Sequence, residues 1–327
     1  MTHKSPLLLK IAMLASLLLP TVALASEDEN FSRWLIEFKQ EARQQGISDK
    51  TLEQAFVGVK PSPRVVKLDR SQPETIQTFQ DYFDKRVTPY RIELGRKQYR
   101  EHRELFQKIE ARFGVQGRFI AALWGMETSY GRFSGGHNVI AALTTLAYDP
   151  RRAKFFRKQL IDALVILDEG HITLEKMKGS WAGAMGQTQF MPSTFRAYAI
   201  DGDGDGKINV WESKADAFAS AAHYLSSIGW RSDQTWGREV QLPAAFDQTL
   251  IKEKVKKSLA EWQALGVRKQ FGQPLPKRDL VATIVQPDGS GTRAFLTYPA
   301  NYSAILDWNR SHKFAISVGT LADAIAR

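Results

Sequence analysis

The spacing of apolar positions predicts helices over most of the chain. Phe106, Ile109 and Phe113 recur at the spacing of one helix face, and Gly114 is placed to end that helix. The last segment, 302–327, returns to the same helical spacing. A largely helical protein is therefore expected.

A different pattern between these helical regions predicts a few short strands. The runs 239–242, 280–286 and 293–298 have strand character, and Pro287-Asp288-Gly289 is typical of a turn. The expected fold class is mainly α, of the α+β type, with a small β-rich lobe.

The length of 327 residues is enough for two or three lobes, each with its own core. The expected segments are a signal peptide (1–25), a helical N-terminal lobe (26–95), a helical core that carries the informative motifs (96–237), a β-rich lobe (238–300) and a C-terminal segment packing back on the core (301–327).

Composition narrows the chemistry. With 43% hydrophobic residues, the chain as a whole is not disordered. It has no cysteine, which excludes disulfide scaffolds, zinc-thiolate sites, iron–sulfur clusters and thiol nucleophiles. Any catalysis must use carboxylates, amides, hydroxyls or imidazoles.

The first 25 residues have the pattern of a cleaved export signal. Lys4 and Lys10 accompany an apolar run from Ile11 to Leu19, and Ala23-Leu24-Ala25 is a small-residue cleavage site before Ser26. The run is too short for a permanent membrane span, for which about 18 apolar residues are needed. An uncleaved anchor is the alternative.

The charge of the mature chain indicates what it could meet after export. Removing two lysines and no acid lowers the formal net charge from +10 to +8. Nucleic acid is not an expected partner outside the cytoplasm, whereas an anionic envelope polymer or membrane surface is. A moderate positive charge can also serve solubility alone.

Residues 201–212 fill the twelve-residue pattern of a calcium loop. Oxygen side chains occupy positions 1, 3, 5, 9 and 12, and Gly206 occupies the sharp turn at position 6. An Asp-Gly surface turn without metal is the alternative. Because sensors use paired loops, a single loop predicts one structural Ca²⁺. The expected ligands are Asp201, Asp203, Asp205, Lys207 through its backbone carbonyl, Asn209 and Glu212.

A carboxylate lies on an apolar helix face. In the predicted helix 119–130, which Gly131 is expected to end, Ile120, Leu123, Trp124 and Glu127 fall within an arc of about 100°. Burial raises the pKa of a carboxyl group, so Glu127 is a candidate general acid. The alternative is that Glu127, near the helix end, reaches solvent and has no function.

A second cluster, 179–193, combines small residues with amide and hydroxyl groups and aromatic surface. This composition suits a sugar-binding cleft, because small residues let a ligand approach the backbone and aromatic faces pack on sugar rings. Taken alone, however, the segment is more typical of a tightly packed helix–loop–helix junction, with Pro192 in the first turn of a helix.

Together these motifs resemble soluble-type lytic murein transglycosylases of the membrane-bound lytic transglycosylase B family, glycoside hydrolase family 103. The resemblance runs from about Tyr82 to the end of the chain. It is carried by Gly125-Met126-Glu127-Thr128 with Tyr130-Gly131, Asp149-Pro150-Arg151-Arg152, Gly179-Ser180, Gly183-Ala184-Met185-Gly186, Gln189-Phe190-Met191-Pro192-Ser193, the calcium loop, Tyr302 and Asn309.

The resemblance implies a lysozyme-like catalytic core that cleaves the β-1,4 bond between N-acetylmuramic acid and N-acetylglucosamine in peptidoglycan. Glu127 matches the single catalytic acid of the family. It would protonate the glycosidic oxygen and then help the muramic acid C6 hydroxyl attack C1, leaving a 1,6-anhydro end. The motif around Glu127 has no second carboxylate, whereas ordinary glycosidases need a pair.

The resemblance also implies substrate contacts. Ser180 and Gln189 match polar contacts beside the acid, and Arg151 and Arg152 match a basic pair near the glycan or its stem peptide. Other cleft-lining positions match Tyr82, Met185, Phe190, Tyr224 and Asn309. The alternative for the apolar members is a place in the core. The chain departs from the family at Phe155, Phe314 and Trp308, where tyrosines are expected.

We expect a monomer in the periplasm that acts on peptidoglycan glycan strands, without a stable membrane anchor, because the lipid-anchor cysteine of some members is absent. Two other functions stay open. One is a hydrolytic muramidase on the same fold, and the other is a non-catalytic, calcium-dependent cell-wall-binding protein.

Overall fold

The computed structural model describes residues 27–71, 77–252, 254–289 and 292–327. The expected signal peptide, 1–25, and its cleavage before Ser26 lie outside the described residues. Among the helices of the described ranges, none is long and apolar enough to cross a bilayer.

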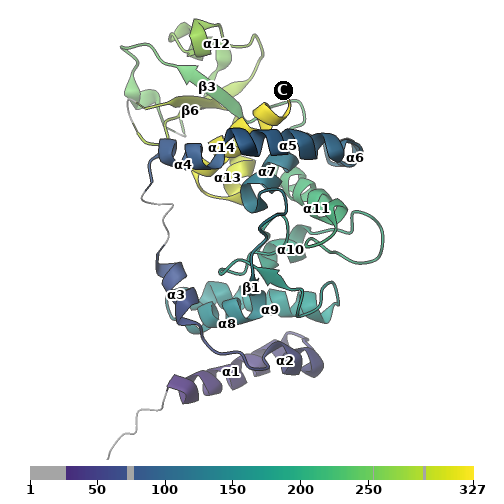
Figure 1. The fold of residues 1–327 in the computed structure, drawn as a ribbon. Coiled ribbons are helices and arrows are strands. Elements are labelled where there is room, and N and C mark those ends of the chain that lie inside the picture. The colour runs from purple at the N-terminus through teal and green to yellow at the C-terminus, as the bar shows by residue number, and fades with distance from the viewer. Residues whose placement is uncertain (1–26, 72–76, 253, 290–291) are drawn as a thin grey trace, which may run out of the picture.

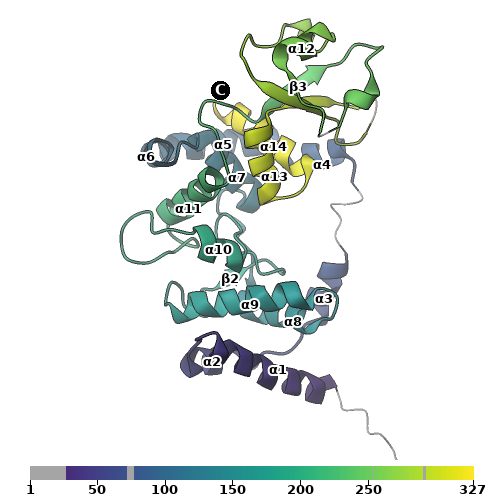
Figure 2. The ribbon, with the colours of Figure 1, turned by 180° about the vertical axis from the view of Figure 1, so that it is seen from behind.

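Helices make up most of the molecule, and Figures 1 and 2 show them from opposite sides. They are α1 (Glu27–Gln44), α2 (Asp49–Ala55), α3 (Pro63–Arg70), α4 (Phe79–Arg86), α5 (Pro89–Glu101), α6 (Arg103–Phe113), α7 (Gly117–Thr128), α8 (Val139–Tyr148), α9 (Ala153–Asp168), α10 (Pro192–Tyr198), α11 (Lys214–Ser227), α12 (Leu259–Ala264), α13 (Pro299–Trp308) and α14 (His312–Ile325).

The strands form two antiparallel sheets. A two-stranded ladder joins β1 (His137–Asn138) to β2 (Lys178–Gly179). The five-stranded sheet has the order β4-β6-β7-β3-β5, which confirms the three strands predicted from the sequence. Its strands are β3 (Gly237–Gln241), β4 (Lys257–Ser258), β5 (Arg268–Lys269), β6 (Val281–Val285) and β7 (Ala294–Thr297), with short 3-10 turns η2 (Gln248–Leu250) and η3 (Gln270–Gly272) between them.

The elements spread along one long axis (Figure 1). At one end α2 packs against α9 and α3 against α8, and at the other end lies the β-rich lobe. Helices α4 and α5 pack instead against α14, and α5 also against α7. The segment expected as one N-terminal lobe is thus divided between two places, and the domain boundaries stay a prediction.

Two hydrophobic cores hold this arrangement. One continuous core runs from Phe38 in α1 to Ile325 in α14, and a smaller one fills the β-rich lobe around Trp262. The two cores meet at strand β6, whose successive side chains point to opposite faces of the sheet. Ile284 packs in the small core, and its neighbour Val285 packs in the large one. The β-rich lobe is therefore attached to the helical body through one face of its hairpin.

Helix α7 is the centre of the large core. Each of its residues except Arg118 and Glu127 is buried. The sequence predicted that this helix continues to Gly131, but it ends at Thr128. The reason is that Ser129 takes a left-handed backbone conformation, φ 51°, which an α-helix cannot include.

Candidate active site

Glu127 lies in the last turn of α7 and is partly buried. Its Oε1 accepts a hydrogen bond of 2.8 Å from the indole Nε1 of Trp308, at the end of α13. These two residues are 181 positions apart in sequence. The fold therefore holds one oxygen of the carboxyl group with a neutral donor and keeps the side chain at the edge of the core.

Aromatic rings fix the donor. The Trp308 ring packs at 5.2 Å from the rings of both Phe190 and Tyr224, and Tyr224 packs edge-on against Tyr198 at 4.9 Å. Burial raises the pKa of Tyr224 to about 12, with smaller contributions from the charges of Asp307 and Tyr198. Tyr224 is thus a neutral hydroxyl group at ordinary pH, and two predicted site residues, Phe190 and Tyr224, meet Glu127 through Trp308.

Thr128 connects the acid to the second predicted cluster. Its hydroxyl donates to the carbonyl of Gln187 at 2.8 Å and accepts from the backbone N–H of Gly131 at 3.0 Å. The Gln189 amide nitrogen then donates to the carbonyl of Ser134 at 3.0 Å. The loop after Glu127 is therefore joined to the 179–193 segment by both hydrogen bonds.

Ser180 and Gln189 both hold the loop that carries them. The Ser180 hydroxyl accepts the backbone N–H of Ala184 at 3.0 Å and of Ala182 at 3.3 Å. Gln189 has a left-handed backbone, φ 52°, and its amide also donates to the carbonyl of Gly186 at 2.9 Å. Each side chain keeps hydrogen-bonding capacity beyond these contacts, the hydroxyl hydrogen of Ser180 and the amide oxygen of Gln189.

The apolar members of the predicted set are mostly in the core. Met185 is fully buried and exchanges two backbone hydrogen bonds with Phe190, whose side chain is also buried. Tyr82 in α4 is buried under the guanidinium of Arg86. Asn309 follows Trp308 directly and is partly exposed. In this conformation Met185, Phe190 and Tyr82 are residues of the large hydrophobic core.

Arg151 and Arg152 lie at the corner between α8 and α9. Both pair with the buried carboxylate of Asp69 in α3, Arg151 at 3.0 Å, so part of their charge is already neutralised. A hollow of about 600 Å³ opens beside the two arginines. It is lined by Pro150, Arg151, Arg152, Ala153, Lys154, Phe155 and Lys158. Within the described part of the chain, no contact joins Arg151 or Arg152 to Glu127, so the structure does not bring this pair to the acid directly.

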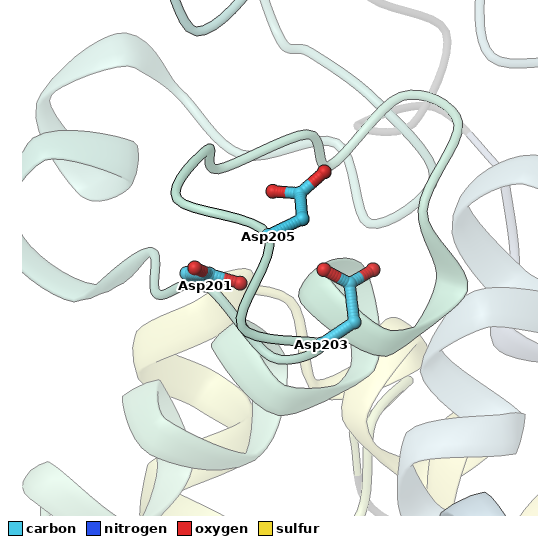
Figure 3. A group of neighbouring side chains, drawn as sticks. All are labelled: Asp201, Asp203 and Asp205. Atoms are coloured by element: carbon cyan, nitrogen blue, oxygen red, sulfur yellow. The ribbon is translucent and has the colours of Figure 1, made fainter.

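The predicted calcium loop, residues 201–212, lies between α10 and α11 as an irregular series of bends and turns. Carboxylate oxygens of Asp201, Asp203 and Asp205 lie within 4.8 Å of one another (Figure 3). Backbone N–H groups, first that of Gly206, hold the pKa of Asp201 below its usual value. Gly206, at φ 87°, allows the sharp turn that brings these carboxylates together. Carboxylate oxygens clustered in this way are the ligands that Ca²⁺ prefers.

The remaining expected ligands of this loop have other partners. Glu212 forms an ion pair with Lys176 at 3.0 Å, and the Asn209 oxygen accepts the backbone N–H of Glu212 at 3.0 Å. Lys207 donates its N–H to Asp205 at 2.8 Å. Buried Asp216 accepts N–H bonds from both Gly202 and Asn209, and so joins the two halves of the loop.

Three residues that contribute to the site were missed by sequence reasoning. Trp308 binds the acid, Thr128 links it to Gln187, and Arg91 in α5 contacts the turn after Glu127. The sequence marked Trp308 only as a departure from the family, and no local spacing indicates any of these long-range contacts.

The sequence and fold are similar to those of known proteins. Residues 30–323 match the family described as the transglycosylase SLT domain. The chain belongs to this family. Membrane-bound lytic murein transglycosylase B of Escherichia coli K12 is 32% identical to the chain over 251 residues, which are 75% of this chain and 66% of that protein.

Solved structures support the same assignment. SltB3 from Pseudomonas aeruginosa, crystallised with NAG-anhNAM-pentapeptide, is 44% identical with a TM-score of 0.87, over 90% of this chain and 79% of that one. Lytic transglycosylase Slt35 from Escherichia coli, in complex with calcium, is 27% identical with a TM-score of 0.74, over 92% and 95%. The resemblance, the mainly helical lysozyme-like fold and the enzyme class, lytic transglycosylase, are confirmed.

Proposed function

We propose that this chain cleaves peptidoglycan between N-acetylmuramic acid and N-acetylglucosamine without water, leaving 1,6-anhydro-muramic acid ends during cell-wall turnover. The observation that carries the proposal is Glu127, partly buried at the end of an otherwise apolar helix and joined to the Gln189 loop. The support from relatives is the anhydro sugar bound to SltB3 from Pseudomonas aeruginosa.

In the proposed mechanism Glu127 is first the acid. Its Oε1 accepts the Trp308 N–H, so we assign the proton to Oε2. This proton passes to the glycosidic oxygen as the C1–O bond breaks, and the N-acetylglucosamine leaves with a hydroxyl at C4. Positive charge then develops at C1 of the muramic acid, next to the new Glu127 carboxylate.

Glu127 is next the base. The C6 hydroxyl of the same muramic acid attacks C1, and its proton returns to the Glu127 carboxylate. The cycle closes without a second carboxylate and without adding water, and the enzyme ends in its starting state. Trp308 stabilises the intermediate carboxylate, because hydrogen bonds to a charged acceptor are stronger than those to a neutral one.

The other predicted residues take supporting roles in the proposal. Ser180 and Gln189 bind hydroxyl and acetamido groups with the capacity left after holding their loop. Tyr224 and Asn309 border the sugar near Trp308, while Tyr82, Met185 and Phe190 support the site from the core. Arg151 and Arg152 with their hollow bind the acidic stem peptide, farther along the strand.

We also propose that residues 201–212 bind one Ca²⁺ through Asp201, Asp203, Asp205, Asn209, Glu212 and the Lys207 carbonyl. Bound calcium would cancel the repulsion of the clustered carboxylates and so stabilise the segment between α10 and α11. Glu212 would exchange Lys176 for the metal. The support is the donor set, together with calcium in the related Slt35 from Escherichia coli.

The segment 1–25 is proposed to direct export to the periplasm, where the mature chain acts as a monomer. Its net positive charge favours approach to the anionic wall.

Glu127→Gln tests the assignment of the acid. Gln keeps the size of the side chain and an oxygen for Trp308, but it cannot donate a proton to the glycosidic oxygen. General acid catalysis is typically worth about 10²- to 10⁴-fold, so release of fragments from purified sacculi should fall by at least 10²-fold. The melting temperature should stay within a few degrees of wild type. Full muralytic activity in this variant would remove Glu127 as the acid.

A further inference from the structure

We propose that Arg91 of α5 is a positioning residue for Glu127, acting through the turn Ser129–Gly131 that follows the acid. The inference rests on the proposed role of Glu127. It starts from the backbone of this turn, where Ser129, Tyr130 and Gly131 have φ values of 51°, 62° and 80° in succession.

Three left-handed residues in a row need an external support. For residues with a Cβ atom this conformation costs roughly 1 to 2 kcal/mol each, and Tyr130 is a bulky example. The turn begins two residues after Glu127, so any relaxation toward a right-handed backbone would redirect the end of α7. What holds the turn therefore also holds the carboxyl group.

Arg91 contacts both non-glycine residues of the turn. Its guanidinium Nη2 donates to the Ser129 hydroxyl at 3.2 Å, and its backbone carbonyl accepts from the Tyr130 hydroxyl at 2.9 Å. The other end of the guanidinium donates to the backbone carbonyl of Arg86 at the end of α4. One residue thus connects α4, α5 and the turn.

Two glycines make room for this contact. A Cβ atom at Gly95 would lie 2.3 Å from the Tyr130 hydroxyl oxygen, and one at Gly125 would lie 2.5 Å from the Tyr130 ring. Tyr130 is buried and packs edge-on against Trp124 at 5.5 Å. The Tyr130 ring is therefore fixed between α5 and α7, and its hydroxyl reaches the Arg91 carbonyl only because Gly95 has no side chain.

The geometry separates this role from substrate binding. The two Arg91 contacts reach Ser129 and Tyr130, whereas the Ser180 hydroxyl is bonded within its own loop and the Gln189 amide to the carbonyls of Ser134 and Gly186. Loss of the Arg91 guanidinium should release the Ser129 side of the turn, while Ser180 and Gln189 keep their own hydrogen bonds. Turnover should fall while the affinity for glycan is kept.

The test measures turnover and binding separately. Arg91→Met removes the guanidinium but keeps most of the length of the side chain. We expect kcat on soluble glycan fragments to fall tenfold or more. In a Glu127→Gln background, Arg91→Met should leave binding to purified sacculi unchanged within twofold. Arg100→Met, an exposed arginine on the same helix, is the matched control and should keep wild-type kcat.

A pair of substitutions at Ser129 keeps the proposal testable if Arg91→Met folds poorly. Ser129→Ala loses the bond but keeps the strained conformation, so kcat and melting temperature should both fall. Ser129→Gly also loses the bond but adopts φ 51° freely, so both kcat and melting temperature should recover toward wild type.

Wild-type kcat in both Arg91→Met and Ser129→Ala would overturn the proposal. So would a loss of sacculus binding in parallel with kcat, which would give Arg91 a general structural role. If Glu127→Gln itself kept full activity, the proposed function would fail first, and Arg91 would have no acid to position.

Discussion

The turn after Glu127 and the calcium loop both bend the chain sharply, but they are held in opposite ways. In the calcium loop, Gly204 and Gly206 carry the left-handed conformations, and the Asp201 carboxylate accepts N–H bonds from both of them. In the turn after Glu127, Ser129 and Tyr130 carry them, and the contacts come from Arg91, 38 and 39 positions away.

Because the two regions are held differently, they should respond differently to metal removal and to substitutions elsewhere in the chain. The predicted calcium loop is held by its own Asp201 and by nearby Asp216, and in our proposal also by a metal, so removing the metal should act locally. The turn after Glu127 has the conformation that its packing imposes, so substitutions far along the chain should reach the acid. The comparison therefore predicts where activity and stability separate.

Trp308→Phe should have the largest of the effects considered next, because it removes a long-range contact of the acid. Phe keeps most of the packing on Phe190 and Tyr224 but loses the N–H group. A hydrogen bond to a charged group is worth about 1.5 to 3 kcal/mol, so kcat should fall by about ten- to a hundredfold. Initial rates of fragment release from sacculi measure this.

Trp262→Phe is the matched control for that substitution. Its indole also donates a hydrogen bond, 3.0 Å to the Ala282 carbonyl, but inside the β-rich lobe. It should lower the melting temperature and leave kcat unchanged. Equal losses of kcat in both variants would mean that the Trp308 hydrogen bond contributes only to folding, as the Trp262 bond does. Trp308 would then have no specific role toward Glu127.

Ser180→Ala and Gln189→Ala should have a smaller effect on rate, about tenfold, from a lost substrate contact of roughly 1 to 3 kcal/mol. Both side chains also hold their loop, so we expect a decrease of a few degrees in melting temperature. Binding of Glu127→Gln double variants to sacculi distinguishes the roles. Binding that equals the Glu127→Gln parent would make both residues structural only.

Calcium removal should have the smallest effect on activity and a clear effect on stability. At a hundredfold excess over Kd, binding stabilises the folded state by about 2.7 kcal/mol, or several degrees in melting temperature. Chelation should reverse this, Ca²⁺ should restore it, and Mg²⁺ should substitute poorly because it prefers six ligands at shorter distances.

Asp203→Asn and Asp247→Asn sharpen the calcium measurement. Asp203→Asn removes a carboxylate from the loop and should weaken the calcium-dependent rise. Asp247 caps a short turn in the β-rich lobe, where Asn serves equally well, so its variant should respond to calcium like wild type. A melting temperature that ignores both chelator and added calcium would show that the loop binds no metal.

The same comparison explains what the sequence could predict. The calcium loop, the strands β3, β6 and β7, and the apolar face that carries Glu127 follow from spacing within a short segment. The end of α7 at Thr128 and the contact from Trp308 do not, because each depends on residues that only the tertiary fold brings close. Burial of Met185 and Tyr82, and the pairing of Arg151 and Arg152 with Asp69, likewise needed the packed structure.

In the proposed mechanism Glu127 is the only group that donates and accepts the proton, and the C6 hydroxyl of the muramic acid, rather than water, attacks C1. Digestion of sacculi in ¹⁸O-labelled water, followed by mass spectrometry of the released fragments, tests it most directly. We expect 1,6-anhydro ends, lighter by one water than hydrolysed fragments and free of label. Fragments with a reducing N-acetylmuramic acid end that carries ¹⁸O would show a hydrolytic muramidase and contradict the account.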